Sequence, residues 1–248
     1  MGRTQEALET AGKELDKRLA VAPRPTRKPG DVKIPSRFSS EGRVECYQNL
    51  RANLQTRYPD RPIKTIVFCS TAHGDGATNT ATRFAFNLAK DRELKVLLVD
   101  ANLRTPYLHE LFQIDHAPGL SDFIGGGSKQ GLPIFKARGT SLYLLPCGTN
   151  HAGPIHLFET KRFDRFLQKV RDKFDYVILD APPVPSFSEA RVICPKVDGV
   201  VLVVNAGKTR RQVALRAKKE LEEAGGKILG VVLNKRKFRV PAWIYRHL

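Results

Sequence analysis

The segment Cys69-Ser70-Thr71-Ala72-His73-Gly74-Asp75-Gly76-Ala77-Thr78-Asn79 decides which fold we expect. It follows the apolar run Ile66-Val67-Phe68 and precedes residues with helical periodicity. A phosphate-binding loop occupies this position, between a strand and a helix, with the pattern G-x-x-x-x-G-K-[ST]. Gly76 and Thr78 fit the pattern, whereas Thr71 replaces its first glycine and Ala77 replaces its lysine. The segment therefore predicts a phosphate-binding loop without its cation.

Around this loop, predicted strands alternate with predicted helices. Most of the strand segments are continuous apolar runs, such as residues 199–204, which is typical of strands buried on both faces of a parallel sheet. We expect an α/β fold, a doubly wound and mostly parallel sheet with helices on both faces, whose ligands bind at the carboxyl ends of the strands. The strands are predicted at 64–70, 95–100, 141–145, 175–180, 198–205 and 227–234, and the helices at 78–90, 155–173 and 209–224.

The 248 residues suffice for one large α/β domain. Four segments are predicted: an N-terminal helix (1–20), a basic proline-rich linker (21–38), the α/β domain (39–235) and a basic aromatic tail (236–248). The stripe of apolar residues on the N-terminal helix is narrow, which suggests weak docking or a partner. No apolar run is long enough for a membrane span or resembles a signal peptide, so we expect a cytoplasmic protein.

Positive charge is concentrated toward the C-terminus. The net charge is +17, and twelve basic residues stand against three acidic ones from Asn205 to Leu248. A basic C-terminal end suits an acidic partner, namely a membrane surface, a nucleic acid or an acidic protein. A solvated face that keeps the protein soluble explains the excess positive charge equally well. The four cysteines (Cys46, Cys69, Cys147 and Cys194) are far apart, which favours free buried thiols over a metal site.

Two further predicted strands end in acidic residues. The strand before Asp100 leads into Asp100-Ala101-Asn102-Leu103-Arg104, and a carboxylate there can hold the water shell of a metal or take a proton from an attacking hydroxyl. The strand at 175–180 has four apolar residues before Asp180, which is the Walker B arrangement that supports Mg²⁺. Thr78 lies where a hydroxyl would ligate the same ion.

From about Glu45 to Leu248, the sequence resembles the bacterial tyrosine kinases of capsule and exopolysaccharide synthesis. These kinases belong to the P-loop class that includes the division-site and plasmid-partitioning ATPases. The resemblance is specific because the order and spacing of several motifs hold across the domain. The motifs are residues 99–109 (VDANLRTPYLH), 119–122 (GLSD), 144–148 (LLPCG), 175–183 (DYVILDAPP), 198–200 (DGV) and 230–234 (GVVLN).

The resemblance implies ATP and Mg²⁺ as cofactors, and a set of site residues. Asp100 matches the Walker A′ aspartate, Asp180 the Walker B aspartate and Asn234 the position that contacts adenine. The expected catalytic residues are Asp100, Asn102 and Asp180, and the expected metal ligands are Thr78, Asp100 and Asp180. The expected nucleotide-binding residues are Gly74, Asp75, Gly76, Ala77, Thr78, Asn79, Arg104 and Asn234.

Several family features are changed in this chain. The signature lysine of the partitioning ATPases would fall at Ala72, and the second carboxylate of Walker A′ is Asn102. The subunit-contact motif reads Glu45-x-x-Gln48-x-x-Arg51, and Tyr245 stands alone where the family has a tyrosine cluster. A hydrogen bond to a charged group contributes roughly 1.5–3 kcal/mol, so nucleotide binding can survive the loss of the lysine through backbone N–H groups and Mg²⁺. Phosphoryl transfer depends more steeply on cations. Arg83 and Arg104 are candidate substitutes for the lysine.

The resemblance also implies a separate membrane adaptor, from the family that regulates polysaccharide chain length, and a ring of subunits. The basic tail then suits a protein or membrane surface better than nucleic acid, or it forms a terminal helix that packs on the domain. Three hypotheses follow, in decreasing order of support. The protein is a degenerate regulatory kinase of exopolysaccharide synthesis, an active tyrosine autokinase of that pathway, or a partitioning-type protein that binds nucleotide and DNA.

Overall fold

The core of the protein is a seven-stranded sheet. The computed structural model describes residues 32–39, 44–60, 62–126, 132–149 and 153–236. Within them the strands follow the order β3-β4-β2-β5-β1-β6-β7, and all neighbours are parallel except β3 and β4. The strands are β1 (Thr65–Ser70), β2 (Val96–Asp100), β3 (Phe135–Lys136), β4 (Leu142–Leu145), β5 (Tyr176–Asp180), β6 (Gly199–Asn205) and β7 (Ile228–Asn234).

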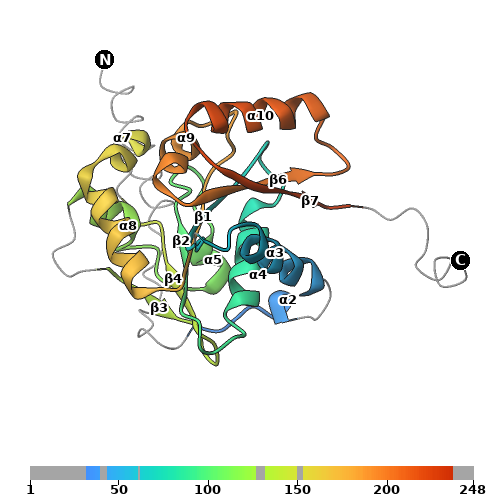
Figure 1. Ribbon diagram of the computed structural model, residues 1–248. Helices are drawn as coiled ribbons and strands as arrows, with labels where there is room; N and C mark the ends of the chain where they lie inside the picture. The colour runs from blue at the N-terminus through green and yellow to red at the C-terminus, as the bar shows by residue number, and fades with distance from the viewer. Residues whose placement is uncertain (1–31, 40–43, 61, 127–131, 150–152, 237–248) are drawn as a thin grey trace, which may run out of the picture.

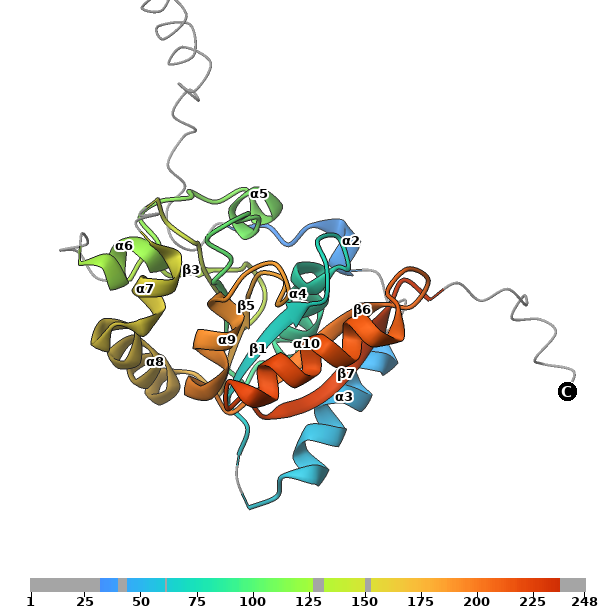
Figure 2. The ribbon, with the colours of Figure 1, turned by 90° about the horizontal axis from the view of Figure 1, so that it is seen from above.

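Helices cover both faces of this sheet (Figure 1). The helices of one face are α2 (Ser36–Ser39), α3 (Val44–Arg57), α4 (Ala77–Leu88) and α5 (Leu108–Phe112). The helices of the other face are α6 (Leu120–Gly125), α7 (Pro154–Glu159), α8 (Lys161–Lys173), α9 (Glu189–Ile193) and α10 (Arg211–Glu223), with a 3-10 turn, η1 (Cys194–Lys196), after α9. Seen from above, α10 lies along β6 and β7 (Figure 2). The predicted doubly wound α/β fold is confirmed.

The strand β1 lies inside the sheet and is buried along its whole length. Successive side chains point to opposite faces, so Val67 and Cys69 belong to one hydrophobic core while Ile66 and Phe68 belong to the other. A strand that packs on both faces has no need for polar alternation, which explains the continuous apolar run. The neighbouring strands on its two sides are β5 and β6, so the loop after β1 opens near the middle of the sheet.

The predicted helix at 155–173 is two helices. Thr160 lies between α7 and α8 with extended backbone angles, φ −71° and ψ 148°. Its hydroxyl accepts a hydrogen bond from the Phe163 backbone N–H at 3.3 Å and donates one to the Leu157 carbonyl at 2.8 Å. Threonine is a favourable N-cap because its side chain pairs an N–H that the first helical turn leaves free. The cap starts a new helix in the middle of an uninterrupted apolar pattern.

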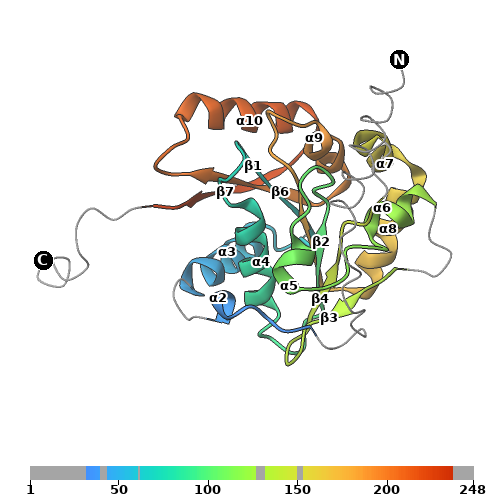
Figure 3. The same cartoon turned by 180° about the vertical axis from the view of Figure 1, so that it is seen from behind.

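The last part of the predicted linker packs on the domain. Val32 and Phe38 are buried. The Phe38 ring in α2 stacks on Phe112 of α5 with the centroids 6.4 Å apart, and the Arg83 guanidinium of α4 lies over the same ring. Figure 3 shows α2, α4 and α5 together on this face. The predicted N-terminal helix (1–20) and the tail beyond Arg236, with Tyr245, lie outside the described residues. No helix in the described ranges has the length and apolar character to cross a bilayer.

Three of the four cysteines are buried, as predicted, whereas the prediction is wrong for Cys46, which is exposed. Burial raises the pKa of the Cys194 thiol to about 11, and it raises the pKa values of Cys69 and Cys147 further. These three thiols are therefore protonated at neutral pH and pack as small apolar side chains.

Candidate functional site

The strand ends that carry the acidic residues meet at one edge of the sheet. Asp180 at the end of β5 is in register with Phe68 of β1 on one side and with Asp100 at the end of β2 on the other. The loop that follows β1 therefore opens beside both carboxylates. This convergence is what the parallel order of the predicted strands implied.

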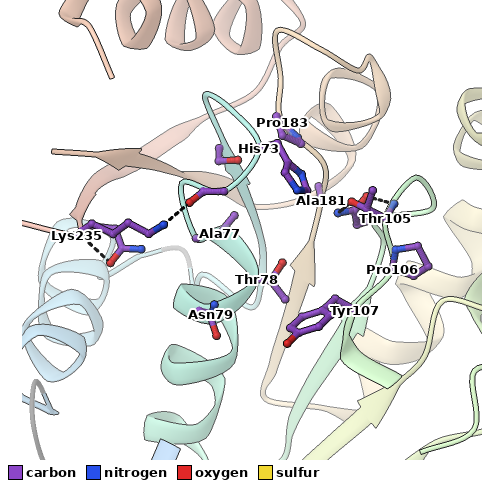
Figure 4. A pocket seen from close by; sticks show the side chains of 15 residues that line it. His73, Ala77, Thr78, Asn79, Thr105, Pro106, Tyr107, Ala181, Pro183 and Lys235 are labelled. Carbon is purple, nitrogen blue, oxygen red and sulfur yellow. Dashed lines mark hydrogen bonds between the residues drawn. The ribbon is translucent and has the colours of Figure 1, made fainter. Parts of the chain in front are cut away.

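A pocket of about 570 Å³ lies at this edge (Figure 4). The loop after β1 and the start of α4 form its floor, the segment after β2 forms one wall, and the residues after β5 and β7 complete it. Most lining side chains are small or polar, and none of those described is acidic. The lining residues are Ser70, His73, Gly74, Gly76, Ala77, Thr78, Asn79, Asn102, Thr105, Pro106, Tyr107, Ala181, Pro183, Asn234 and Lys235.

The loop over residues 71–76 is shaped by two glycines and one buried aspartate. Gly74 and Gly76 have φ values of 83° and 96°, a left-handed conformation that favours glycine. The Asp75 carboxylate is buried beneath the loop, where it accepts hydrogen bonds from the Thr71 hydroxyl at 2.5 Å and the Ala72 N–H at 2.9 Å. Asp75 thus faces away from the pocket, and its side chain holds the loop in shape.

Asn234 at the end of β7 supports the same loop. Its side-chain Nδ2 donates a hydrogen bond to the Asp75 carbonyl at 2.9 Å. A β-carbon at position 76 would overlap this nitrogen, so the absence of a side chain at Gly76 permits the contact. Asn234 also lines the pocket, which is compatible with the predicted adenine contact. The helix α4 begins at Ala77, so its N-terminal N–H groups and its dipole face the pocket and favour an anion there.

The two strand-end aspartates have different surroundings. The Asp100 carboxylate accepts hydrogen bonds from the backbone N–H groups of Asn102, Tyr107 and Leu108 at 3.0 to 3.2 Å. Burial raises the Asp100 pKa to about 6, although these donors act in the opposite direction. Asp100 therefore orders the segment after β2, in addition to any role that it has toward a metal.

Asp180 is buried, and neither of its carboxylate oxygens has a hydrogen-bond partner among the described residues. Its pKa is raised by burial first and then by the charge of Asp100, while the neighbouring Thr78 hydroxyl lowers it. A buried carboxylate without donors is costly unless a cation approaches it. The Asp180 carboxylate at the strand end and the neighbouring Thr78 hydroxyl, which lines the pocket, are both hard oxygen ligands, and such a pair fits Mg²⁺.

The other predicted residues are placed as follows. Asn102 lines the pocket, and its amide group is held by Thr105: Nδ2 donates to the Thr105 hydroxyl and Oδ1 accepts from the Thr105 N–H, both at 3.1 Å. Arg104 does not line the pocket. Its guanidinium pairs with the fully buried Glu189 at 2.7 Å, and Arg83 lies over Phe38 instead. Neither arginine replaces the missing lysine in this structure.

Seven of the predicted site residues therefore line the pocket: Gly74, Gly76, Ala77, Thr78, Asn79, Asn102 and Asn234. Asp100 and Asp180 lie below it at the strand ends, Asp75 lies inside the loop, and Arg104 points elsewhere. The pocket also takes in residues that were not predicted as site residues, among them Tyr107 and Lys235. Lys235 directly follows β7, so its place after a parallel strand was the signal that could have identified it.

Comparison with known proteins is consistent with this geometry. No family model matches the chain. A tyrosine-protein kinase, CpsD of Streptococcus agalactiae, is 30% identical over 204 residues, which are 82% of this chain and 88% of that protein. The chain belongs to the bacterial tyrosine-protein kinases. The crystal structure of the chimerical protein CapA2B2 is 26% identical to this family member, with a TM-score of 0.76 over 85% of this chain and 95% of the other.

The fold of these kinases is shared more widely. The septum site-determining protein MinD of Pyrococcus horikoshii, which was solved with Mg-ADP, has a TM-score of 0.59 and covers 74% of this kinase-family chain and 76% of its own. At 22% identity this likeness shows the fold alone. It confirms the P-loop type of α/β fold that the sequence predicted.

The isolation of Asp180 leads to a prediction about stability. Because its folded pKa is raised, Asp180 is protonated in the folded state at pH values where the unfolded chain is already ionised, so its contribution to stability falls as the pH rises through this range. Asp180→Asn stays neutral at every pH. We expect the variant, without ligand, to gain stability relative to the wild type as the pH rises above the unfolded pKa of about 3.9, so the gain is small at pH 4 and larger at pH 8. Urea unfolding at the two pH values measures the free energy of unfolding of both proteins.

The control is Asp198→Asn, which should lose stability relative to the wild type as the pH rises. The N–H groups of Lys64 and Thr65, together with Arg171, lower the Asp198 pKa against the effect of burial.

Proposed function

We propose that this chain is a regulatory kinase-like subunit that binds Mg²⁺ and ATP but transfers phosphate poorly. The observation that carries the proposal is the combination of a formed phosphate loop with alanine at both positions, Ala72 and Ala77, where the P-loop class places a lysine. Binding and turnover depend on these features to different degrees. Backbone N–H groups and the dipole of α4 favour a phosphate in the ground state, whereas phosphoryl transfer needs cations that meet the charge developing in the transition state.

The residues of the pocket divide the work as follows. The N–H groups of Gly76, Ala77 and Thr78, at the start of α4, would receive the phosphates. Thr78 and Asp180 would hold Mg²⁺, which when bound neutralises negative charge between the phosphate oxygens. Asp100 orders the segment that carries Asn102, and its ionised carboxylate, whose pKa is raised by burial, would take the proton from an acceptor hydroxyl.

The test combines binding with activity in one preparation. Titration with labelled ATP and Mg²⁺ should give saturable binding that EDTA and Asp180→Ala weaken. Phosphotyrosine blots of the same protein should stay faint after incubation with ATP. Strong autophosphorylation that disappears in Asp180→Ala would instead show an active autokinase, and absence of ATP binding would remove nucleotide from the proposal altogether.

The biological setting is also proposed. The relatives named tyrosine-protein kinases support a cytoplasmic component of capsule or exopolysaccharide synthesis that a membrane adaptor of the chain-length-regulating family recruits. In the subunit-contact motif of this chain, Arg51 pairs with Asp91 of the same chain at 3.3 Å, and Gln48 is exposed. An intrachain partner for Arg51 weakens the case for a ring held together by this residue. We further propose the division into an N-terminal helix (1–20), a linker (21–38), the α/β domain (39–235) and a tail (236–248), with the end of the linker packed on the domain through the buried Val32 and Phe38.

A partitioning-type function on DNA has less support. Binding of that kind rests on phosphate contacts, so the affinity should fall steeply with salt. Retention of a labelled duplex at low ionic strength that disappears at 200 mM salt would favour it over the regulatory kinase. We expect no such retention, because the relatives that the chain matches are named tyrosine-protein kinases.

A further inference from the structure

One cation reaches the pocket from a part of the chain remote from the phosphate loop. Among the described lining residues, Lys235 alone is a lysine or arginine. It follows the last strand, and its ammonium nitrogen donates a hydrogen bond to the Gly74 carbonyl at 2.6 Å. In Figure 4 the Lys235 side chain extends toward the loop from the side of the pocket opposite Thr105 and Pro106, and its end lies near Ala77.

The backbone directs this side chain. Lys235 has a φ of 56°, in the left-handed region that residues other than glycine seldom adopt, and its N–H donates to the Asn234 side-chain oxygen at 2.9 Å. Asn234 is itself anchored on the Asp75 carbonyl through its Nδ2. The turn after β7 is therefore fixed to the loop by two residues in succession, through the Asn234 amide on the Asp75 carbonyl and the Lys235 ammonium on the Gly74 carbonyl.

We propose that Lys235 supplies the positive charge for the nucleotide phosphates that the phosphate loop no longer carries. The proposal rests on the proposed binding of ATP at this site and names the residue that makes it possible. A lysine ammonium has three donors, and the Gly74 carbonyl takes only one of them. The two others are available to phosphate oxygens at the mouth of the loop. No acidic side chain is among the described lining residues, so nothing there neutralises the charge.

Lys235 suits binding better than catalysis. Its flexible stem carries a compact charge that can follow a phosphate group, but it enters from the rim and is exposed. A lysine in place of Ala77 would start from the first turn of α4, next to Thr78 and the transferred phosphate. The position of Lys235 thus accounts for a protein that retains ATP while its turnover is impaired.

The experiment measures the affinity for Mg-ATP in a double-mutant cycle of Lys235→Ala and Ala77→Lys. A hydrogen bond to a charged group corresponds to roughly 1.5–3 kcal/mol, so Lys235→Ala should weaken ATP binding about tenfold to a hundredfold. Lys235→Arg should keep most of the affinity. The matched control Lys208→Ala removes an exposed lysine from the loop after β6, outside the pocket lining, and should change the affinity less than twofold.

The cycle distinguishes two roles of Lys235: binding the phosphates of ATP, or only stabilising the loop through the Gly74 carbonyl. If Lys235 binds phosphate, Ala77→Lys should restore affinity in the Lys235→Ala background and gain much less in the wild-type background, because the two charges serve the same group. Equal gains in both backgrounds, or unchanged binding in Lys235→Ala, would overturn the proposal while the proposed function stands. Absence of ATP binding by the wild type would refute the proposed function itself, and this inference with it.

Discussion

Replacing one alanine should restore kinase activity: we expect Ala77→Lys to raise the rate of tyrosine phosphorylation by roughly 10²–10³. Ala77 is the first residue of α4 and lines the pocket beside Thr78. A lysine there matches the G-x-x-x-x-G-K-[ST] pattern at its cationic position. Its ammonium would meet negative charge that develops on the transferred phosphate, which is the stage at which a cation lowers a barrier rather than merely tightening binding.

The measurement uses labelled ATP and a tyrosine-containing copolymer as acceptor, so that the single Tyr245 of the tail does not limit the rate. Ala77→Met is the matched control, because it adds a side chain of similar length without charge and should stay as slow as the wild type. Ala77→Lys combined with Asp180→Ala should lose the gain. If the lysine and methionine variants are equally slow, the missing cation is not the cause, and the amide at Asn102 in place of a carboxylate becomes the next candidate.

Much of the fold could be predicted because its strands are buried on both faces. The six predicted strands became β1, β2, β4, β5, β6 and β7, and the predicted end of the last helix at residue 224 lies within one residue of the end of α10 at Glu223. The two-residue strand β3 was not predicted. It pairs with β4 through Phe135 and Lys136 only, and such a short edge strand has too few residues to show a period.

The location of the site could be predicted from the sequence, but the orientation of several of its side chains could not. The order of strand ends placed Thr78 and Asp180 together, because parallel strands bring their carboxyl ends to one edge. In the structure, the Arg104 guanidinium forms an ion pair at 2.7 Å with the buried Glu189, 85 positions along the chain. The local spacing of residues could not predict this contact. Hydrogen bonds between distant segments decide where a long side chain points, and they have no signature in the sequence.

The sequence also could not show which hydrogen bonds hold the phosphate loop in shape. Asp75 was expected to bind nucleotide because the family resemblance places the phosphate loop at residues 74–78. Its carboxylate is instead taken up by Thr71 and Ala72 inside the loop, and its carbonyl by Asn234 from β7. Asn234 was expected to contact the adenine base, and the structure adds a contact of 2.9 Å that fixes the shape of the loop. The phosphate loop therefore depends on the last strand of the sheet.

That dependence can be tested at a single glycine, for which we expect Gly76→Ala to weaken Mg-ATP binding by roughly a hundredfold. Two costs combine at this position. A left-handed conformation costs a residue other than glycine about 1–2 kcal/mol, and the φ of Gly76 is 96°. The new β-carbon would also displace the Asn234 side chain from its bond to Asp75. The N–H groups at the start of α4 would then no longer be held in line with a phosphate.

Two other glycines separate these costs. Gly74→Ala at φ 83° and Gly139→Ala at φ 74° have open space around the new β-carbon, so each carries the backbone strain without the overlap. Gly139 lies outside the pocket lining, so its variant should lose stability and keep its affinity for ATP. Gly74→Ala should fall between the two, since it strains the loop but leaves Asn234 in place. Equal affinities for Gly74→Ala and Gly76→Ala, measured by titration at a temperature where both are folded, would show that backbone strain alone governs the loop. A lower affinity for Gly76→Ala would identify the contact between Asn234 and Asp75 as the element that keeps the altered loop able to bind ATP.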